Sequence, residues 1–306
     1  MPDAFSTQKR IAAIHDISGF GKCSLTVVLP ILSATGVEAC ALPTAVLSTH
    51  TGGFTGYTMR DLTEDLLPIA KHWRSLNLHF DALYSGFLAS YEQIDLVSRI
   101  FDLLSDAGTL CVVDPCMADN GKLYRVYSPD MVQGMKQLCA KAGLLIPNIT
   151  EAAMLADMPY RPDLAGDRVY LQQLLEGLAS LGCPRVVLTG VRPQPGQIGA
   201  ACYEKGGLIT YASAQEVAGH YHGTGDVFAS ALLGGMMRGL GIRQSAQVAA
   251  DFTARSIARS AGRHTDERYG VAFEEELPFL INALGLHERV LNKKNKSGPH
   301  GPLVGP

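Results

Sequence analysis

Short apolar runs alternate along the chain with longer segments in which apolar residues recur at helical intervals. The apolar runs have the length and composition of buried strands and fall at residues 10–14, 38–42, 81–85, 110–114, 144–146 and 185–189. The helical intervals lie between these runs, at residues 22–34, 60–75, 91–107 and 167–181. Two further apolar runs, at residues 198–203 and 208–211, predict a hairpin, and helices are expected to dominate from Gly225 onward.

This alternation predicts an α/β fold with a mostly parallel central sheet, helices on both of its faces and a small C-terminal hairpin. No internal repeat or linker interrupts the pattern, so we expect a single domain over residues 1–291. Residues 292–306 are rich in Lys, Gly, Pro and Ser, a composition typical of a disordered tail.

The composition narrows the class of protein. Apolar residues make up 47% of the 306 residues and charged residues 18%, which supports a large core and excludes a disordered chain. The net charge is −3 without a basic stripe, so we expect no nucleic-acid partner. The seven cysteines are scattered without a Cys-x-x-Cys pair, which favours a reducing, cytoplasmic location over a zinc site or disulfide framework. The polar first ten residues and the lack of an apolar run of about 20 residues predict neither a signal segment nor a membrane span.

Polar residues cluster directly after the predicted strands. In a mostly parallel sheet these positions share one edge, where ligands bind. The clusters are Asp16 with Ser18, residues 49–53, residues 85–87, residues 114–121, residues 147–151, and Thr189 with Gly190. Six such clusters are difficult to explain by turn chemistry alone, so we expect one shared active site at this edge.

The stretch Gly223-Thr224-Gly225-Asp226 is the most informative motif of the chain. Its two glycines allow the backbone to approach a ligand, and the helix that follows directs free N–H groups and its positive dipole end at the loop. Such a loop binds anions, most often phosphate. A carboxylate would repel a bound anion, so Asp226 suggests chemistry, namely removal of a proton from a hydroxyl that attacks phosphorus. The alternative is a core helix that follows a tight turn.

A second glycine-rich segment, residues 19–24, resembles a Walker phosphate loop but lacks two of its essential residues. Asp16 stands where the motif needs its first glycine, and Cys23 stands where it needs Ser or Thr. We therefore expect Lys22 to be a surface charge near a helix start.

Three carboxylates suit metal–nucleotide chemistry. Asp114 and Asp119 lie five apart after a strand, and Glu151 lies three residues after Asn148 at a helix start. Oxygen ligands of this kind suit Mg²⁺, usually together with water and the phosphates of ATP. The alternatives are a simple turn at residues 119–121 and a capping box formed by Asn148 and Glu151.

These motifs together resemble the pyridoxal kinases of the ribokinase-like superfamily over about residues 11–257. Residues 223–226 match the anion hole and catalytic aspartate of that superfamily, and residues 148–151 match its Asn-x-x-Glu motif. Residues 114–119 resemble the Asp-Pro-Val-Met-Gly-Asp segment of the pyridoxal kinases, and residues 48–52 resemble their Ser-Asn-His-Thr-Gly segment. The resemblance implies ATP-dependent phosphorylation of the 5′-hydroxymethyl group of pyridoxal, pyridoxine or pyridoxamine, and a homodimer.

The resemblance also implies roles for individual residues. Asp226 would be the general base, and Gly223, Thr224 and Gly225 would stabilise charge on the transferred phosphoryl group. Asp119 and Glu151 would hold Mg²⁺, largely through water, and a monovalent cation such as K⁺ is a further possible cofactor. The nucleotide-binding residues would be Asp114, Asn148, Thr189, Lys122 and Tyr124, with residues 120–128 acting as a flap. The substrate-binding residues would be Asp16, Ser18, His50, Thr51 and Phe87.

The chain departs from the pyridoxal kinase pattern at several positions. Cys116 replaces valine, Ala118 replaces glycine and Ile146 replaces threonine, while Asp16 stands where the family has serine. An aspartate beside a pyridine ring would favour cationic groups, so the preferred vitamer stays open. Cys116 is interpreted as a small buried hydrophobe rather than a reactive thiol.

Other interpretations stay open at this point. His220 and His222 lie two apart, but no third ligand is near in sequence, so we do not expect a metal site there. A hydroxymethylpyrimidine kinase is the alternative activity, because that substrate also carries a hydroxymethyl group on a six-membered nitrogen ring. A pyridoxal-phosphate-binding protein on the same fold is the alternative without catalysis.

Overall fold

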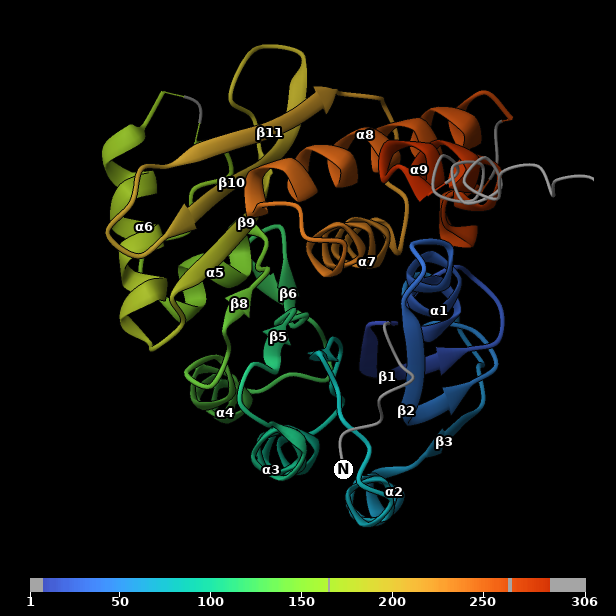
Figure 1. The fold of residues 1–306 in the computed structure, drawn as a ribbon. Coiled ribbons are helices and arrows are strands. Elements are labelled where there is room, and N and C mark those ends of the chain that lie inside the picture. Colours follow the sequence, from blue (N-terminus) through green and yellow to red (C-terminus); the bar gives the residue numbers. More distant parts are fainter. Residues whose placement is uncertain (1–7, 165, 264–265, 287–306) are drawn as a thin grey trace, which may run out of the picture.

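The computed structural model describes residues 8–164, 166–263 and 266–286. Within these residues, nine strands form one sheet in the order β11-β10-β9-β8-β5-β4-β1-β2-β3 (Figure 1). Their bounds are β1 Arg10–Ser18, β2 Glu38–Leu47, β3 Met59–Asp61, β4 Ala82–Ser85, β5 Leu110–Val113, β8 Leu144–Leu145, β9 Arg185–Val191, β10 Gln197–Glu204 and β11 Thr210–Gln215. The short strands β6 (Ala118–Asp119) and β7 (Lys122–Leu123) form a separate two-stranded sheet.

Helices cover both faces of the large sheet. One face carries α2 (Thr63–Ser75), α3 (Tyr91–Leu104), α4 (Pro129–Cys139), α5 (Ile149–Leu155) and α6 (Arg168–Ser180). The other face carries α1 (Leu25–Ala34), α7 (Thr224–Met237), α8 (Ile242–Ala261) and α9 (Leu277–Ala283), with the short 3₁₀ helices η1 (Glu267–Tyr269) and η2 (Phe273–Glu276) between α8 and α9. The predicted α/β class with a mostly parallel, doubly covered sheet is therefore confirmed.

Strand β1 shows why a two-residue period builds this architecture. Ala12 and Ile14 pack into the core under α2 and α3, whereas Ile11 and Ala13 pack into the core under α1 and α7. Successive side chains of a strand point to opposite faces, so a strand with apolar residues at every position serves two cores.

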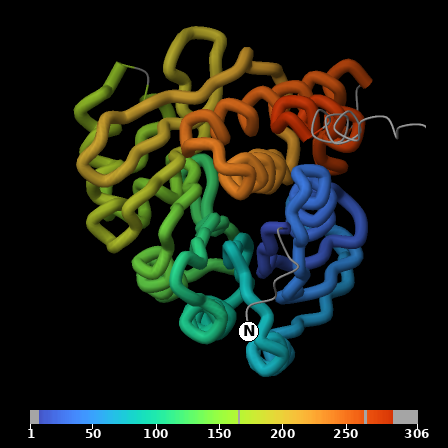
Figure 2. The backbone as a smooth tube through the Cα atoms, viewed as in Figure 1, coloured from blue at the N-terminus to red at the C-terminus, as the bar shows by residue number. Residues whose placement is uncertain are grey.

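The parallel strands bring the predicted polar clusters to one edge. Strands β1, β2, β4, β5, β8 and β9 are linked by parallel pairings. The six predicted clusters lie at the carboxyl ends of these strands, either in the last residues of the strand, as for Asp16, Ser18, Thr189 and Gly190, or directly after it. Helix α7, drawn in orange near the centre of Figure 2, lies between the blue N-terminal elements and the yellow strands β9 to β11. Residues more than 200 positions apart in sequence therefore meet beside it.

The structure corrects several predicted boundaries. The segment predicted as one helix at 60–75 contains the edge strand β3, and α2 begins only after a turn in which Asp61 Oδ1 accepts a hydrogen bond from Thr63 N–H at 2.7 Å. The helix predicted from Lys22 begins at Leu25, because Ser24 has a backbone φ of 51°. Strand β2 continues to Leu47, and helix α4 was not predicted.

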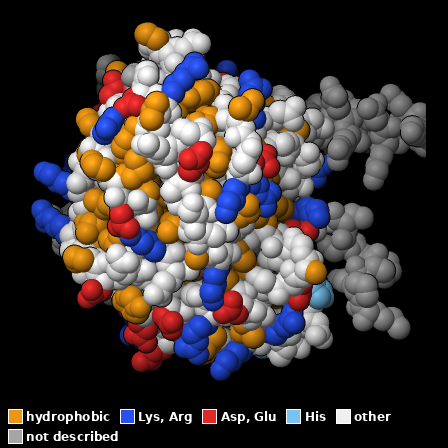
Figure 3. Space-filling view, turned by 90° about the vertical axis from the view of Figure 1, so that its left-hand side faces the viewer, with side chains coloured by type: hydrophobic (Ala, Val, Ile, Leu, Met, Phe, Trp, Pro, Cys, Tyr) orange, Lys and Arg blue, Asp and Glu red, His pale blue; other side chains and the backbone are white. Residues whose placement is uncertain are grey.

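The predicted hairpin is an extension of the central sheet. Strand β10 pairs antiparallel with both β9 and β11, so the hairpin adds two strands to one edge. The surface around this end of the molecule mixes Lys and Arg with Asp and Glu side chains among apolar ones (Figure 3). None of the helices in the described ranges is long and apolar enough to span a membrane. The predicted tail at 292–306 lies outside the described residues, and the single domain over 1–291 stays a prediction.

Candidate active site

Helix α7 begins at the predicted anion loop. Gly223 is its N-cap in the left-handed conformation, with φ of 76°, and no described side chain caps the helix. A Cβ atom on Gly223 would lie 1.9 Å from the carbonyl oxygen of Lys22, so only glycine fits there. A Cβ atom on Gly225 would meet nothing within 4 Å. The start of α7 therefore borders open space at Gly225, and no hydrogen bond among the described residues engages the N–H groups of Thr224, Gly225 or Asp226, as an anion site requires.

Asp226 lies in the first turn of α7 with one of its two carboxylate oxygens engaged. Its Oδ2 accepts a hydrogen bond from Ser24 N–H at 2.8 Å, and no other hydrogen bond reaches this carboxylate from the described residues. Burial raises the pKa of Asp226 to about 7; the Ser24 N–H opposes the shift and the charge of Asp16 adds to it. A carboxylate with a pKa near neutrality and a free oxygen is suited to accept a proton.

Asp16 is buried at the end of β1 and is held by two hydroxyl groups. Ser24 Oγ donates to Asp16 Oδ1 at 2.6 Å, and Ser18 Oγ donates to Asp16 Oδ2 at 3.0 Å. Burial raises the pKa of Asp16, and the two hydroxyl groups oppose that shift. Asp16 and Ser18 therefore belong to one network that reaches Asp226 through Ser24.

Glu151 and Asn148 form the capping box that the sequence offered as an alternative. Asn148 Oδ1 accepts from Glu151 N–H at 2.9 Å, and Glu151 Oε2 accepts from Asn148 N–H at 2.9 Å. Glu151 Oε1 also accepts from Met117 N–H at 3.1 Å. One carboxylate oxygen thus holds the N-cap of α5 and the other holds the loop after β5, so this residue shapes the site.

Asp114 and Glu151 form a pair of carboxyl groups with raised pKa values. Burial raises the pKa of Asp114 well above its usual range, and the charges of Glu151 and then Asp226 raise it further. Burial also raises the pKa of Glu151 to about 8. The structure thus places Asp114, Glu151 and Asp226 within electrostatic range of one another, as the shared-site prediction required.

Asp119 stands at the tip of the two-stranded sheet formed by β6 and β7. Its two oxygens accept hydrogen bonds from the backbone and the side chain of Asn120, at 2.8 and 3.0 Å. His220 Nε2 lies 3.8 Å from Asp119 Oδ2. Lys122 and Tyr124 follow on the same hairpin and are exposed, with Tyr124 anchored by its N–H to the carbonyl of Met117 at 2.9 Å. The predicted flap is therefore a small hairpin beside the carboxylates.

His50 links two loops through its ring nitrogens. Its Nδ1 accepts from Gly52 N–H at 3.1 Å, which places the ring proton on Nε2, and Nε2 donates to the carbonyl of Arg268 at 2.6 Å. Thr51 is exposed beside it. Both nitrogens of His50 are thus occupied by backbone, which fixes this loop against η1.

Among the described residues, no hydrogen bond or ring contact joins Phe87 or Thr189 to Asp16, Ser24 or Asp226. Phe87 is half-buried with its ring 6.2 Å from the ring of Tyr127. Thr189 Oγ1 donates to the carbonyl of Pro147 at 3.2 Å, which ties the end of β9 to the Asn148 loop. Their roles toward substrate and nucleotide stay predictions.

Lys22 is a charge near a helix start, as predicted, whereas Cys116 is half-buried and not the fully buried residue that was predicted. Burial and the nearby charges of Asp114 and Glu151 raise the pKa of the Cys116 thiol well above its usual range, so it stays protonated and unreactive. Lys22 Nζ forms an ion pair with Glu274 Oε2 at 2.7 Å, which makes it a structural charge.

The donor set fits a divalent cation that is shared with a nucleotide. In the described part of the chain, Asp114, Glu151 and Asp226 form no ion pair with Lys or Arg, so their charges are uncompensated. No group of three or more His, Cys, Asp or Glu side chains in the described ranges is placed to hold an ion alone. An ion held by Asp119 and Glu151 would therefore draw its remaining ligands from water and phosphate, as Mg²⁺ does.

Sequence reasoning missed three contributors to the site. Ser24 has no role in the sequence analysis, and only the structure reveals that it contacts two carboxylates. Phe54 and Tyr269 have stacked rings with centroids 6.4 Å apart beside His50, although they are 215 positions apart. No local pattern signals such a contact, because it depends on how α8 and η1 return to the sheet.

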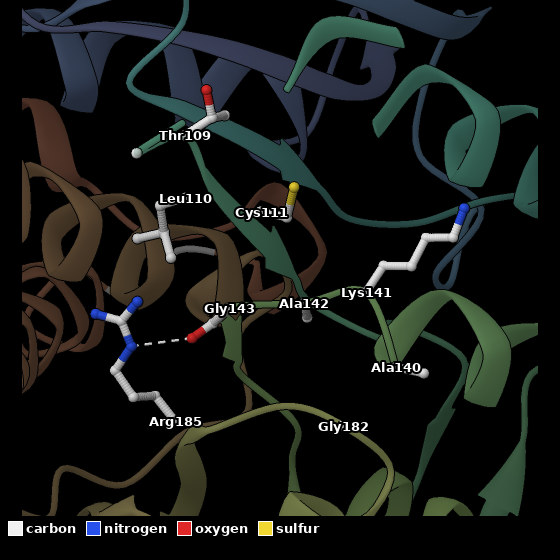
Figure 4. A pocket seen from close by; sticks show the side chains of 10 residues that line it. Thr109, Leu110, Cys111, Ala140, Lys141, Ala142, Gly143, Gly182 and Arg185 are labelled. Carbon is white, nitrogen blue, oxygen red and sulfur yellow. Dashed lines mark hydrogen bonds between the residues drawn. The ribbon is translucent and has the colours of Figure 1, made fainter. Parts of the chain in front are cut away.

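A cavity of about 390 Å³ lies away from this site, at the amino ends of β5, β8 and β9. Figure 4 shows Arg185 donating through Nε to the carbonyl of Gly143, at 3.0 Å, with the side chain of Lys141 directed away from it. The carboxylates described above lie at the opposite, carboxyl ends of the strands. The active site is therefore assigned to that edge of the sheet and not to this cavity.

An uncapped helix N-terminus with Asp226 in its first turn, at the carboxyl edge of this sheet, is typical of a phosphotransferase of the ribokinase-like class. The chain belongs to the phosphomethylpyrimidine kinase family, which it matches over residues 29–269. Kinases of this family use ATP as the phosphoryl donor.

Three relatives illustrate this membership. The hydroxymethylpyrimidine/phosphomethylpyrimidine kinase of Bacillus subtilis is 24% identical over 232 residues, which are 76% of this chain and 81% of the relative. A Bacteroides thetaiotaomicron protein assigned as a phosphomethylpyrimidine kinase, crystallised with pyridoxal, is 38% identical with a TM-score of 0.83, covering 89% of this chain and 96% of its own. The pyridoxal kinase of Lactobacillus plantarum is 32% identical with a TM-score of 0.82, covering 93% and 99%.

Proposed function

We propose that this protein transfers the γ-phosphoryl group of ATP to the 5′-hydroxymethyl group of a vitamin B6 vitamer. The observation that carries the proposal is the geometry of Asp226, which has one free oxygen beside the open N-terminus of α7. Two relatives above 30% identity support the acceptor, since one is a pyridoxal kinase and the other binds pyridoxal.

The reaction follows from the roles of the described groups. With a pKa of about 7, Asp226 is ionised in a large fraction of molecules near neutral pH and accepts the proton of the acceptor hydroxyl as its oxygen attacks the γ-phosphorus. The N–H groups at the start of α7, beginning with Thr224 and Gly225, stabilise the charge on the transferred phosphoryl group. The bond between the γ-phosphorus and the oxygen that links it to the β-phosphorus breaks, and ADP leaves with that oxygen.

We propose that the remaining predicted residues hold the metal ion, the nucleotide and the acceptor. Asp119 and Glu151 would hold Mg²⁺, which neutralises the negative charge of the phosphates. Asp114, Asn148, Thr189, Lys122 and Tyr124 would position the nucleotide. Asp16, Ser18, His50, Thr51 and Phe87 would form the acceptor pocket, with His50 acting through the loop that it fixes. A homodimer and a monovalent-cation requirement stay proposals that rest on the resemblance.

A hydroxymethylpyrimidine kinase is the second candidate. The family that the chain matches and the Bacillus subtilis relative favour it, and its acceptor carries the same hydroxymethyl chemistry. The sequence Ser48-Thr49-His50-Thr51-Gly52 favours the vitamin B6 acceptors.

A steady-state comparison of acceptors tests the proposal. ADP release is measured with Mg²⁺-ATP and each of pyridoxal, pyridoxamine, pyridoxine and hydroxymethylpyrimidine, with Asp226→Asn as the matched control. We expect the highest kcat/KM with a B6 vitamer and a fall in kcat of about 10²–10⁴-fold in Asp226→Asn. A preference for the pyrimidine would establish the second candidate. Tight pyridoxal phosphate binding without turnover would establish a non-catalytic binding protein.

A further inference from the structure

Ser24 has a backbone conformation that is costly for any residue with a side chain. Its φ is 51° and its ψ is −137°, just before helix α1. The other described non-glycine residues with positive φ are Asn77, Asn120 and Asp157, which are residue types that tolerate this region. Strain of this kind concentrates at functional sites.

The side chain of Ser24 does not cap helix α1, although its position suggests that role. Serine is among the preferred N-cap residues, yet its hydroxyl makes no capping bond to α1. Both of its donors reach carboxylates instead. The hydroxyl donates to Asp16 Oδ1 at 2.6 Å, and the backbone N–H donates to Asp226 Oδ2 at 2.8 Å. One buried residue therefore joins the end of β1 to the start of α7.

The turn that contains Ser24 is closely packed against the anion loop. The carbonyl of Lys22 occupies the space where Gly223 would carry a Cβ atom, 1.9 Å from that position. Lys22 N–H in turn donates to the carbonyl of Tyr269 at 3.1 Å. Movement of this turn would therefore displace both the N-cap of α7 and the partner of Asp226.

We infer that Ser24 is a positioning residue for Asp226. Its hydroxyl, anchored on Asp16, holds the strained turn in which its N–H fixes one oxygen of Asp226 and leaves the other free for the acceptor hydroxyl. The inference rests on the proposed function, in which Asp226 is the general base.

The N–H of Ser24 is important for the ionised form of Asp226 because of the other groups near this carboxylate. They are Asp16 on β1, Cys23 in the turn, Tyr84 on β4, and Asp114 and Cys116 after β5. Each of these is acidic, and no Lys or Arg of the described chain pairs with Asp226. The N–H of Ser24 is therefore the contact that favours the ionised carboxylate.

A comparison of Ser24→Ala with Ser24→Gly tests the inference. Both variants remove the hydroxyl, but only glycine adopts the observed φ and ψ without strain. In Ser24→Ala we expect the turn to relax, so that the N–H bond is lost, the titration of Asp226 moves to higher pH by about one unit and kcat falls by about tenfold or more. In Ser24→Gly we expect a clearly smaller shift of the titration and a smaller fall in kcat, because the backbone keeps its conformation although the anchor on Asp16 is lost.

The titration is read by carbon NMR of labelled aspartate carboxyl groups, assigned with Asp226→Asn, at temperatures below the measured thermal midpoint of each variant. If Ser24→Gly loses as much activity as Ser24→Ala, or if Ser24→Ala leaves the titration in place, the inference is overturned. The titration needs no substrate. Failure of the proposed function, seen as full activity in Asp226→Asn, is therefore distinguishable from failure of the role of Ser24.

Discussion

The carbonyl oxygen of Lys22 occupies the place that a side chain on Gly223 would need, 1.9 Å from the ideal Cβ position. The contact joins the turn before α1 to the N-cap of α7, across 201 positions of sequence. The contact is a second reason, in addition to the positive φ of 76°, why the anion loop needs glycine at this position. Gly225 has no such neighbour, because its ideal Cβ lies in open space.

These two glycines form a matched pair of test sites. Gly223→Ala combines a backbone clash with a strained φ, so we expect a loss of stability of at least about 2 kcal/mol and a loss of activity. Gly225→Ala should keep the thermal midpoint within about 2 °C but raise KM for ATP, because its methyl group enters the anion site. Thermal unfolding and ATP titrations check both. Equal losses of stability would contradict the assigned geometry.

Substitutions of the two proposed metal-binding carboxylates should differ in their effect on stability, because the two residues have different structural roles. Asp119→Ala removes an exposed carboxylate and should raise the Mg²⁺ concentration needed for half-maximal activity with little change in stability. Glu151→Ala should raise it as well but also lose about 1 kcal/mol of stability, because the capping box is broken. Activity is titrated against Mg²⁺ for both variants, alongside thermal melts. Unchanged Mg²⁺ midpoints would mean that both carboxylates only shape loops.

The raised pKa values make stability depend on pH in a defined direction. In the folded protein the pKa of Asp226 is about 7 and that of Glu151 about 8, against 3.8 and 4.5 as ordinary values. Between these limits the folded state binds more protons than the unfolded chain, so stability falls as pH rises from about 4 to about 8. Without Mg²⁺, we expect a lower thermal midpoint at pH 8.5 than at pH 6. The decline should be smaller in Asp226→Asn, and a midpoint that rises with pH would refute the assignment.

Asp16 is a candidate selector of the preferred vitamer. Its charge should favour the ammonium group of pyridoxamine by about 1 kcal/mol at a partly solvated contact. Asp16→Asn removes the charge and keeps an acceptor for the Ser24 hydroxyl, and Asp16→Ser restores the commoner family residue. In both variants kcat/KM for pyridoxamine should fall several-fold more than kcat/KM for pyridoxal. Equal changes for the two vitamers would leave Asp16 with only its structural role.

Local patterns in the sequence determined the sheet, its parallel strands and the edge where polar residues gather. The unbroken apolar run of β1 from Ile11 to Ile14 supplies side chains to two cores, because successive side chains of a strand point to opposite faces. The Asn148–Glu151 capping box is equally local, because it depends on residues within four positions.

Tertiary structure alone decided which of these local features act together. Ser24 has no role in the sequence analysis, but in the structure its two donors reach Asp16 and Asp226. His50 reads as a pocket residue, yet its ring is held by the carbonyl of Arg268, which follows it by 218 positions. The pKa of Asp226 likewise depends on burial between elements that are distant in sequence. Hydrophobic patterns with a period of two or 3.6 residues specify which face of a strand or helix is buried, whereas the contacts between these faces depend on how the whole chain packs.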